Sequence, residues 1–150
     1  MQTSDLPTVI ATWIRHAQER RKEDFWAWDW VKARVLWDGS AEEAWTITTE
    51  LVRAAPDELL GFIGAGPVED LVNRFGGELI DWIEGEARRD PRFQDALGAI
   101  WLQIGTLPPE IEARIVAASG GRIEPFEIAT DQEAAFERDV DRLTKPQADA

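Results

Sequence analysis

Few side chains in this sequence have the types and spacing that catalysis requires. His16 is the only histidine, cysteine is absent, and the serines are Ser4, Ser40 and Ser119. A base at His16 would need a nucleophile from elsewhere in the chain, and Ser4 and Ser40 fit the starts of helices instead. Without thiolates or a second histidine, a transition-metal site is not expected. We therefore predict no catalytic residue, no cofactor and no metal.

A glycine segment followed by two carboxylates could also support chemistry. Gly64-x-Gly66 precedes a helix, whose backbone amides could hold a phosphate. Glu69 and Asp70 then lie in the first helical turn, where they would repel an anion. These adjacent carboxylates also point about 100° apart on a helix, a poor geometry for an acid–base pair. We expect a structural turn in which the glycines allow positive φ angles and close helix approach.

Tryptophan is the residue type most concentrated in one place. Three of the eight tryptophans lie between Phe25 and Trp30, and Trp37 follows two helical turns later. On a helix these residues form two apolar stripes, one of Phe25, Trp28, Val31 and Val35 and the other of Trp26, Trp30, Ala33 and Trp37. One stripe is sufficient to dock a surface helix, and we assign Phe25 and Trp28 to that core stripe.

The second stripe leaves two alternatives. Tryptophan is enriched at the energetic centres of protein interfaces, because it buries a large area at a low cost in rotamer entropy. Trp26, Trp30 and Trp37 are therefore our predicted binding residues. The alternative is that the same three indoles pack against the first helix, opposite Trp13 and Ile14.

Charge is distributed unevenly along the chain. The net charge is −13, yet residues 1–37 hold six basic and five acidic side chains, whereas residues 38–150 hold ten and twenty-four. An acidic body repels phosphates, so direct binding to nucleic acid or an anionic membrane is not expected. It permits a basic protein partner or mimicry of nucleic acid, and the alternative is that the charge serves solubility alone. A partner of the neutral, tryptophan-rich part need not be basic.

The acidic run from Asp131 to Leu143 resembles a calcium loop only superficially, because the required D-x-[DN]-x-[DN]-G spacing is absent. Phe136 and Val140 instead give this run the apolar face of a helix. A second candidate partner surface consists of its carboxylates Glu133, Glu137 and Asp141. A solvated acidic helix is the alternative.

Helical spacing and turn residues organise most of the chain. Helices are expected over 6–17, 24–38, 40–55, 56–63, 67–75, 79–87, 91–101 and 108–118. Asp24 and Ser40 are the expected N-caps of the second and third helices, and Ser119-Gly120-Gly121 is expected to end the helix over 108–118. Residues 123–128 alternate like a strand, but Pro125 favours an extended edge segment. A further helix is expected over 131–143.

The predicted fold is all-α. Short connections imply antiparallel neighbours, so we expect a compact stack of about eight short helices, similar to the hairpins of HEAT-type α-solenoids but without a strict repeat. Residues 1–143 form one domain in this prediction, and residues 144–150 form a disordered tail. No apolar run is long enough to span a membrane, and no signal peptide is visible at the N-terminus. The expected location is cytoplasmic.

Three segments together resemble a known family. They are the Trp/Phe-rich helix, the segment Gly64-Ala65-Gly66-Pro67-Val68-Glu69-Asp70-Leu71-Val72, and the segment Glu86-Ala87-Arg88-Arg89-Asp90-Pro91-Arg92-Phe93 followed by Leu97 and Trp101. Their order and spacing resemble a bacterial all-helical family of unknown function with a GAGPLEDL-like core, over about residues 25–101. The resemblance implies a helical bacterial protein and transfers no catalytic residue.

These observations predict a non-enzymatic protein-binding module, such as an inhibitor, immunity or accessory factor for a partner protein. Two other classes stay open. One is an enzyme or small-molecule binder with a tryptophan-lined pocket near Trp26 and Trp30. The other is a structural subunit that forms a homo-oligomer through its aromatic face.

Overall fold

The computed structural model describes residues 5–127. Its α-helices are α1 (Leu6–Glu19), α2 (Phe25–Lys32), α3 (Ala41–Ala54), α4 (Leu60–Ile63), α5 (Glu69–Phe75), α6 (Ile80–Arg89), α7 (Pro91–Leu97) and α8 (Pro109–Ala118). Two 3-10 turns, η1 (Lys22–Asp24) and η3 (Asp57–Leu59), and two π-helical turns, η2 (Ala33–Asp38) and η4 (Gly64–Val68), adjoin them.

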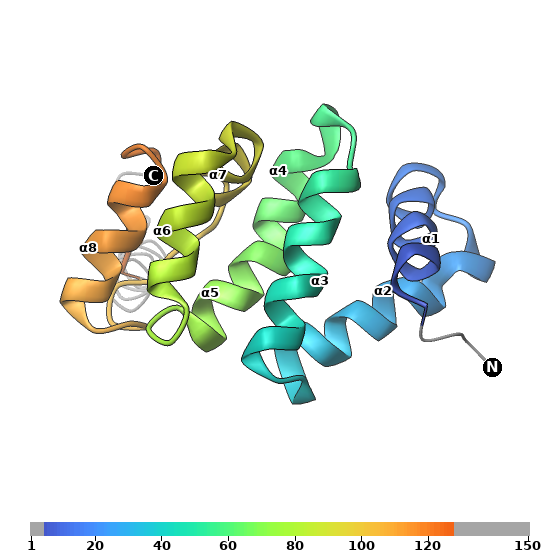
Figure 1. Cartoon of the computed structure of the whole chain (residues 1–150), viewed down its shortest axis with the longest axis horizontal. Coiled ribbons are helices and arrows are strands. Elements are labelled where there is room, and N and C mark those ends of the chain that lie inside the picture. Colours follow the sequence, from blue (N-terminus) through green and yellow to red (C-terminus); the bar gives the residue numbers. More distant parts are fainter. Residues whose placement is uncertain (1–4, 128–150) are drawn as a thin grey trace, which may run out of the picture.

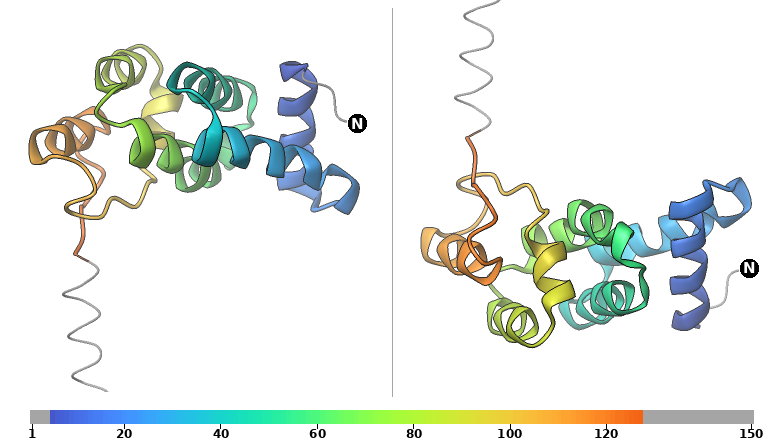
Figure 2. Two further views of the ribbon diagram at one scale, coloured as in Figure 1. Left: turned by 90° about the horizontal axis from the view of Figure 1, so that it is seen from below. Right: turned by 90° about the horizontal axis from the view of Figure 1, so that it is seen from above.

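The prediction of an all-α fold is confirmed. Because the 3-10 and π turns are continuous with their neighbouring α-helices, residues 5–127 form seven continuous helical segments, against the eight expected over this range. These segments follow one another broadly in chain order, from α1 at one end of the molecule to α8 at the other (Figure 1). The views from below and above show the same succession (Figure 2). None of the described helices is both long and apolar enough to cross a membrane.

Helix α3 lies at the centre of the packing. It contacts α1, α4, α5, α7 and the η2 turn. Its stripe of Ala44, Ile47 and Leu51 is buried, as helical spacing predicts. Arg92 of α7 closes the far end of α3, because its guanidinium donates hydrogen bonds to the carbonyls of Val52 and Ala55. The surface of α3 that remains exposed is therefore held in place from several sides.

The assignment of Phe25 to the core is wrong. Phe25 is 47% exposed, whereas Ala27, Val31 and Val35 are buried. The buried line thus combines Val31 and Val35 of the first predicted stripe with Ala27, so the helix is rotated relative to the prediction and Phe25 is turned toward solvent. The large aromatic rings lie on either side of that line, with Trp28 partly buried against the core.

The prediction that Gly64-Ala65-Gly66-Pro67 separates two helices is also wrong. The chain continues from α4 into α5 through the π turn, and neither glycine has a positive φ angle. A π turn accommodates Pro67, which has no N–H to donate. The expected close approach holds at Gly64, where an added Cβ would lie 2.1 Å from the carbonyl oxygen of Ala96 in α7. At Gly66 an added Cβ would meet nothing within 4 Å.

Helix ends agree with the sequence at some positions and differ at others. Ser40 caps α3, since its Oγ accepts a hydrogen bond from the Glu43 amide at 3.1 Å. Asp24 occupies the expected N-cap position of α2 but its side chain makes no capping hydrogen bond. Its carboxylate instead accepts two hydrogen bonds from Arg15, both at 2.8 Å. This buried carboxylate therefore ties the end of α1 to the start of α2.

Beyond α7 the chain is less regular. The helix ends at Leu97, earlier than the expected position 101, and Trp101 lies in the following loop. After α8, Gly120 and Gly121 have positive φ angles of 75° and 77°, as a helix stop predicts. Phe126 then forms an isolated parallel bridge with Gln103, which agrees with the expected extended edge segment. The predicted helix 131–143, with Glu133, Glu137 and Asp141, and the predicted tail 144–150 lie outside the described residues.

Candidate binding surface

The three predicted binding tryptophans do not form one surface. Trp26 and Trp30 are half-buried and pack against the core, whereas Trp37, at the end of the η2 turn, is 70% exposed. The Arg34 guanidinium lies over the Trp30 ring, 3.8 Å from its centroid. Trp30 is the member of this set that takes part in the concave surface described next.

Three adjoining hollows flank α3, and we call their combined lining the α3 surface. The tryptophan cleft, of about 510 Å³, is lined by Glu42, Trp45, Thr46, Asp81, Trp82, Gly85 and Arg89. The Trp30 hollow, of about 520 Å³, is lined by Leu6, Trp30, Arg34, Ser40, Glu42, Glu43, Thr46 and Ile47. The N-terminal groove, of about 580 Å³, is lined by Leu6, Pro7, Ile10, Ala11, Ile14, Glu50 and Ala54.

The hollows adjoin one another, because neighbouring hollows share lining residues. Glu42 and Thr46 line both the tryptophan cleft and the Trp30 hollow, and Leu6 lines both the Trp30 hollow and the N-terminal groove. The α3 surface therefore extends from α6, across α3 and the end of α2, to α1.

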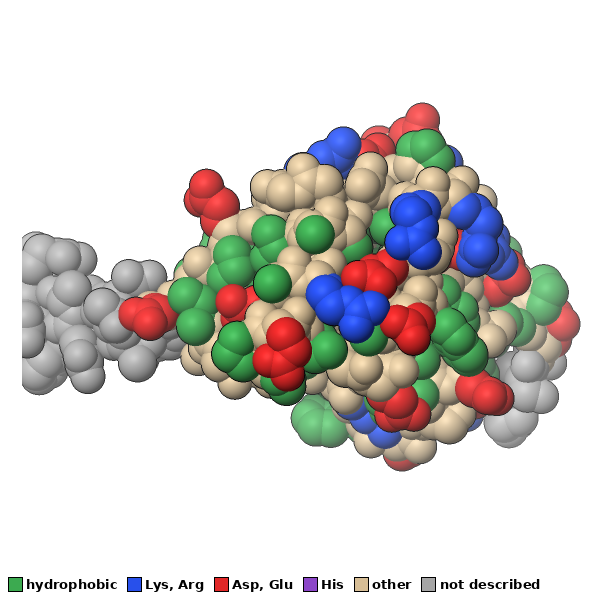
Figure 3. All heavy atoms as spheres, turned by 60° about the vertical axis from the view of Figure 1, so that its left-hand side comes forward, with side chains coloured by type: hydrophobic (Ala, Val, Ile, Leu, Met, Phe, Trp, Pro, Cys, Tyr) green, Lys and Arg blue, Asp and Glu red, His purple; other side chains and the backbone are tan. Residues whose placement is uncertain are grey.

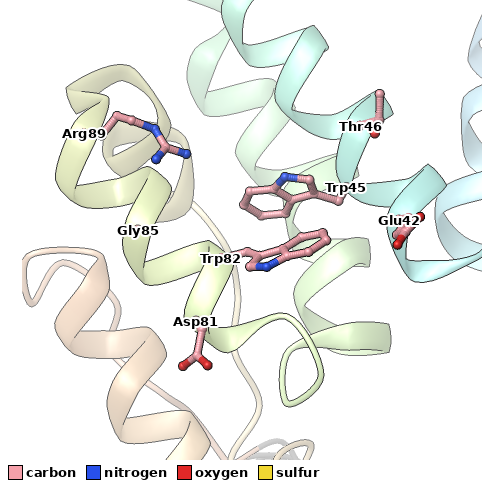
Figure 4. A pocket seen from close by; sticks show the side chains of 7 residues that line it. All are labelled: Glu42, Trp45, Thr46, Asp81, Trp82, Gly85 and Arg89. Atoms are coloured by element: carbon pink, nitrogen blue, oxygen red, sulfur yellow. The ribbon is translucent and has the colours of Figure 1, made fainter.

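Two indoles form the wall of the tryptophan cleft. Trp45 and Trp82 have ring centroids 5.8 Å apart and planes inclined at 59°. Figure 4 shows the two side chains pointing toward one another from α3 and α6. Trp45 also packs on the buried Phe93 of α7, with centroids 5.8 Å apart. Trp45 is thus fixed by the core, while Trp82 is 46% exposed.

A buried carboxylate fixes the basic end of the cleft. Glu86 is 2% exposed and accepts hydrogen bonds from Arg89 at 2.5 Å and from Arg53 at 3.0 Å. Burial by itself raises the pKa of Glu86, but the hydrogen bonds from both arginines outweigh it and the pKa is lowered. Arg89 therefore enters the cleft already paired with a buried carboxylate, which it shares with Arg53.

The opposite end of the cleft has an excess of carboxylates over arginines. Asp81 and Glu84 share Arg114, whose guanidinium lies 2.8 Å and 2.6 Å from their respective carboxylate oxygens. The hydrogen bond from Arg114 lowers the pKa of Glu84. Glu42, in the first turn of α3, has no ion-pair partner among the described residues, so the charge of this end is negative.

The groups that could do acid–base or nucleophilic chemistry have structural partners. His16 is nearly buried, and its Nδ1 donates to the Arg21 carbonyl at 3.2 Å. The Ser119 hydroxyl is buried and donates to the Val116 carbonyl at 2.6 Å. Within residues 5–127, no group of three or more acidic, histidine or cysteine side chains could hold a metal ion.

Glu69 and Asp70 likewise point to different partners. Glu69 accepts a hydrogen bond from the Trp101 amide at 2.8 Å, and Asp70 lies 3.4 Å from the Lys32 Nζ. Burial raises the pKa of both carboxyl groups, and Lys32 opposes the rise at Asp70. They form no carboxylate pair, as the predicted helical geometry requires.

Other exposed aromatic residues lie outside the α3 surface. Trp101 is 69% exposed and contacts Phe126 edge-on, with centroids 5.9 Å apart. On the face that Figure 3 shows, hydrophobic side chains are interspersed with acidic and basic ones. Trp101 and Trp37 therefore provide exposed indoles that can serve as controls for those of the α3 surface.

Comparison with known proteins places the chain in a family. The model of a family of unknown function, DUF6869, matches residues 15–123. The chain belongs to this family. The match confirms the resemblance to a family of unknown function and extends it beyond residues 25–101 in both directions. No curated protein and no solved structure matches the chain.

The family match includes most of the α3 surface but omits the α1 residues before Arg15. Trp45 and Trp82, which line the tryptophan cleft, were absent from the predicted binding set. A partial signal existed for Trp45, because it lies outside the buried stripe of α3. Nothing in the sequence indicates that the two indoles meet across 37 positions.

Proposed function

We propose that this protein is a protein-binding module whose partner docks on the α3 surface. The observation that carries the proposal is that three hollows adjoin one another over α1, the end of α2, α3 and α6, with half-exposed indoles on two of them. A surface of this extent suits a folded partner or a long peptide, because a metabolite would fill one hollow alone.

The residue types of the α3 surface support the same conclusion. Tryptophan and arginine are enriched at the energetic centres of interfaces, and Trp30, Trp45, Trp82 and Arg34 are of these types. Each indole is held by contacts within the chain, so little side-chain freedom is lost on binding. As a binder that contributes no chemistry of its own, the protein would act as an inhibitor, immunity or accessory factor for its partner.

The test is affinity capture from the native host with matched variants. Trp82→Ala removes an indole from the α3 surface, and Trp101→Ala removes an equally large, exposed indole outside it. We expect a partner that wild type and Trp101→Ala retain and that Trp82→Ala loses, by at least about tenfold in affinity, as for an interface hot spot. Equal capture by all three proteins would contradict the assignment of the α3 surface.

A small-molecule binder is the second candidate function. The tryptophan cleft favours it, because a volume of about 510 Å³ lies within the range of ligand sites and its lining combines indoles with charged groups. A metabolite library screened by thermal shift tests this function. A ligand that raises the melting temperature of wild type but not of Trp82→Ala would support it over a protein partner.

A further inference from the structure

We propose that the tryptophan cleft binds a cationic side chain, arginine or lysine, that a partner protein inserts between Glu42 and the indoles of Trp45 and Trp82. This inference rests on the proposed function and adds the chemistry of the contact. It concerns one hollow of the α3 surface, and it can fail while the rest of that surface still binds a partner.

The indoles provide the first half of the argument. A cation is attracted to the negative face of an aromatic ring, most strongly to tryptophan, and the methylene stem of arginine or lysine packs on the same ring. Trp82 is 46% exposed, and it lines the cleft together with Trp45 from the facing helix α3 (Figure 4). A guanidinium or a lysine stem can therefore reach the exposed part of the Trp82 indole from solvent.

The carboxylates provide the second half. Glu42 lines the cleft and has no ion-pair partner within residues 5–127, and Asp81 shares Arg114 with Glu84. The cation of the cleft, Arg89, is bound to the buried Glu86 at 2.5 Å. An anionic ligand would meet Glu42 and Asp81 and a chain of net charge −13, whereas a cationic one would be attracted by all three.

In the neighbouring Trp30 hollow, an arginine of the chain itself already lies between an indole and a carboxylate. There the Arg34 guanidinium lies 3.8 Å from the centroid of the Trp30 ring, and its Nε lies 4.0 Å from the Glu43 carboxylate. An indole and a carboxylate in the first turn of α3 thus hold a cation within this surface. The tryptophan cleft presents an indole pair and the adjacent carboxylate, Glu42, to a cation from outside.

The experiment uses the full chain and two short peptides. Acetyl-Gly-Arg-Gly-amide is titrated against its citrulline analogue, which has the same shape without the charge, while the indole N–H signals are followed by NMR. We expect the arginine peptide to shift the signals of Trp45 and Trp82 and to bind about fivefold more tightly than the citrulline peptide. Signal assignment uses Trp45→Phe and Trp82→Phe.

Two variants separate the cleft from the overall charge. Glu42→Gln should abolish the preference for arginine, whereas Glu58→Gln, in the η3 turn and outside the α3 surface, should retain it. Both substitutions remove one carboxylate that has no ion-pair partner within residues 5–127, so they change the net charge alike and break no salt bridge described in this range. An unchanged circular dichroism spectrum confirms that each variant is folded.

Three results would overturn the inference: equal affinity for the two peptides, no shift of the two indole signals, or equal loss of preference in both glutamate variants. If capture of the partner still depends on Trp82 in any of these cases, the proposed function stands, and the inference that the cleft binds a cationic side chain is wrong. If capture is independent of Trp82 while the arginine preference holds, the proposed function fails instead.

Discussion

Thr48 has a buried hydroxyl group that makes no hydrogen bond within the described residues. Its side chain is fully buried in α3, and its Oγ1 has no partner in the described structure. Burying an unpaired hydroxyl is unfavourable by about 1–3 kcal/mol. This residue therefore weakens the helix that carries the α3 surface.

Replacing this hydroxyl by a methyl group should stabilise the protein. We expect Thr48→Val to raise the free energy of unfolding by about 1 kcal/mol, because the side chain keeps its shape and loses the unpaired polar atom. Urea denaturation followed by circular dichroism measures the change. The control is Thr49→Val, which should destabilise, since the Thr49 hydroxyl donates to the Trp45 carbonyl at 2.9 Å. A loss of stability in Thr48→Val would show that the hydroxyl is satisfied.

The link between α1 and α2 should make stability depend on pH. Hydrogen bonds from Arg15 hold the pKa of Asp24 below its ordinary value, against the opposing effect of burial. A carboxyl with a depressed folded-state pKa stabilises the fold above its ordinary pKa of about 3.9, and this contribution is lost as the pH falls through the folded-state pKa.

Asp24→Asn should accordingly lower the free energy of unfolding at neutral pH. The difference from wild type should shrink as the pH falls below about 4, where Asp24 becomes protonated first in the unfolded chain and, at lower pH, in the folded protein. Urea denaturation across this range gives the comparison, with the exposed Asp29→Asn as the control for the loss of one charge. A difference that is constant with pH would mean that Asp24 acts through its shape and not its charge.

At the scale of elements, the close contact between the η4 turn and α7 requires a glycine at position 64. An added Cβ would lie 2.1 Å from the Ala96 carbonyl oxygen, which is backbone and cannot rotate away. Gly61, one turn earlier on α4, has nothing within 4 Å of an added Cβ. The two glycines lie in the same continuous helical segment and differ in what faces them.

Gly64→Ala should separate α4 and α7 and lower the free energy of unfolding by about 3 kcal/mol, in the upper range for overpacked cores. Gly61→Ala should instead raise it by about 0.5 kcal/mol, because alanine favours the helix. Thermal denaturation of both variants distinguishes the two effects. A neutral Gly64→Ala would mean that the π turn can shift to admit a methyl group.

At the scale of the whole molecule, the net charge of −13 opposes self-association. Copies of the chain repel each other at neutral pH, and this repulsion is strongest at low ionic strength. We therefore expect a monomer by sedimentation equilibrium in low-salt buffer at neutral pH. A stable dimer there would favour the alternative of a structural homo-oligomer, with the aromatic face buried between copies.

Sequence patterns with local causes predicted the structure well. The cap at Ser40 and the glycine stop after α8 depend on hydrogen bonds and φ angles within a few residues, so they can be predicted from neighbouring positions. The buried stripe of α3 follows from helical periodicity. The helix break predicted at Gly64 was wrong, because a π turn can carry a proline through a helix. Whether the chain forms a π turn or a break there depends on how α7 packs against this segment, which neighbouring residues do not determine.

The sequence by itself determined the all-helical fold, the acidic charge and the richness in tryptophan, because these depend on composition and on periodicity along one chain segment. Tertiary structure alone decided which indoles line the proposed binding surface. Trp30 lines the α3 surface and Trp37 does not, and Trp82 meets Trp45 only because α3, α6 and α7 pack together around Phe93. The contact between positions 45 and 82 depends on how helices distant in sequence are arranged in space, which the local pattern around either residue does not encode.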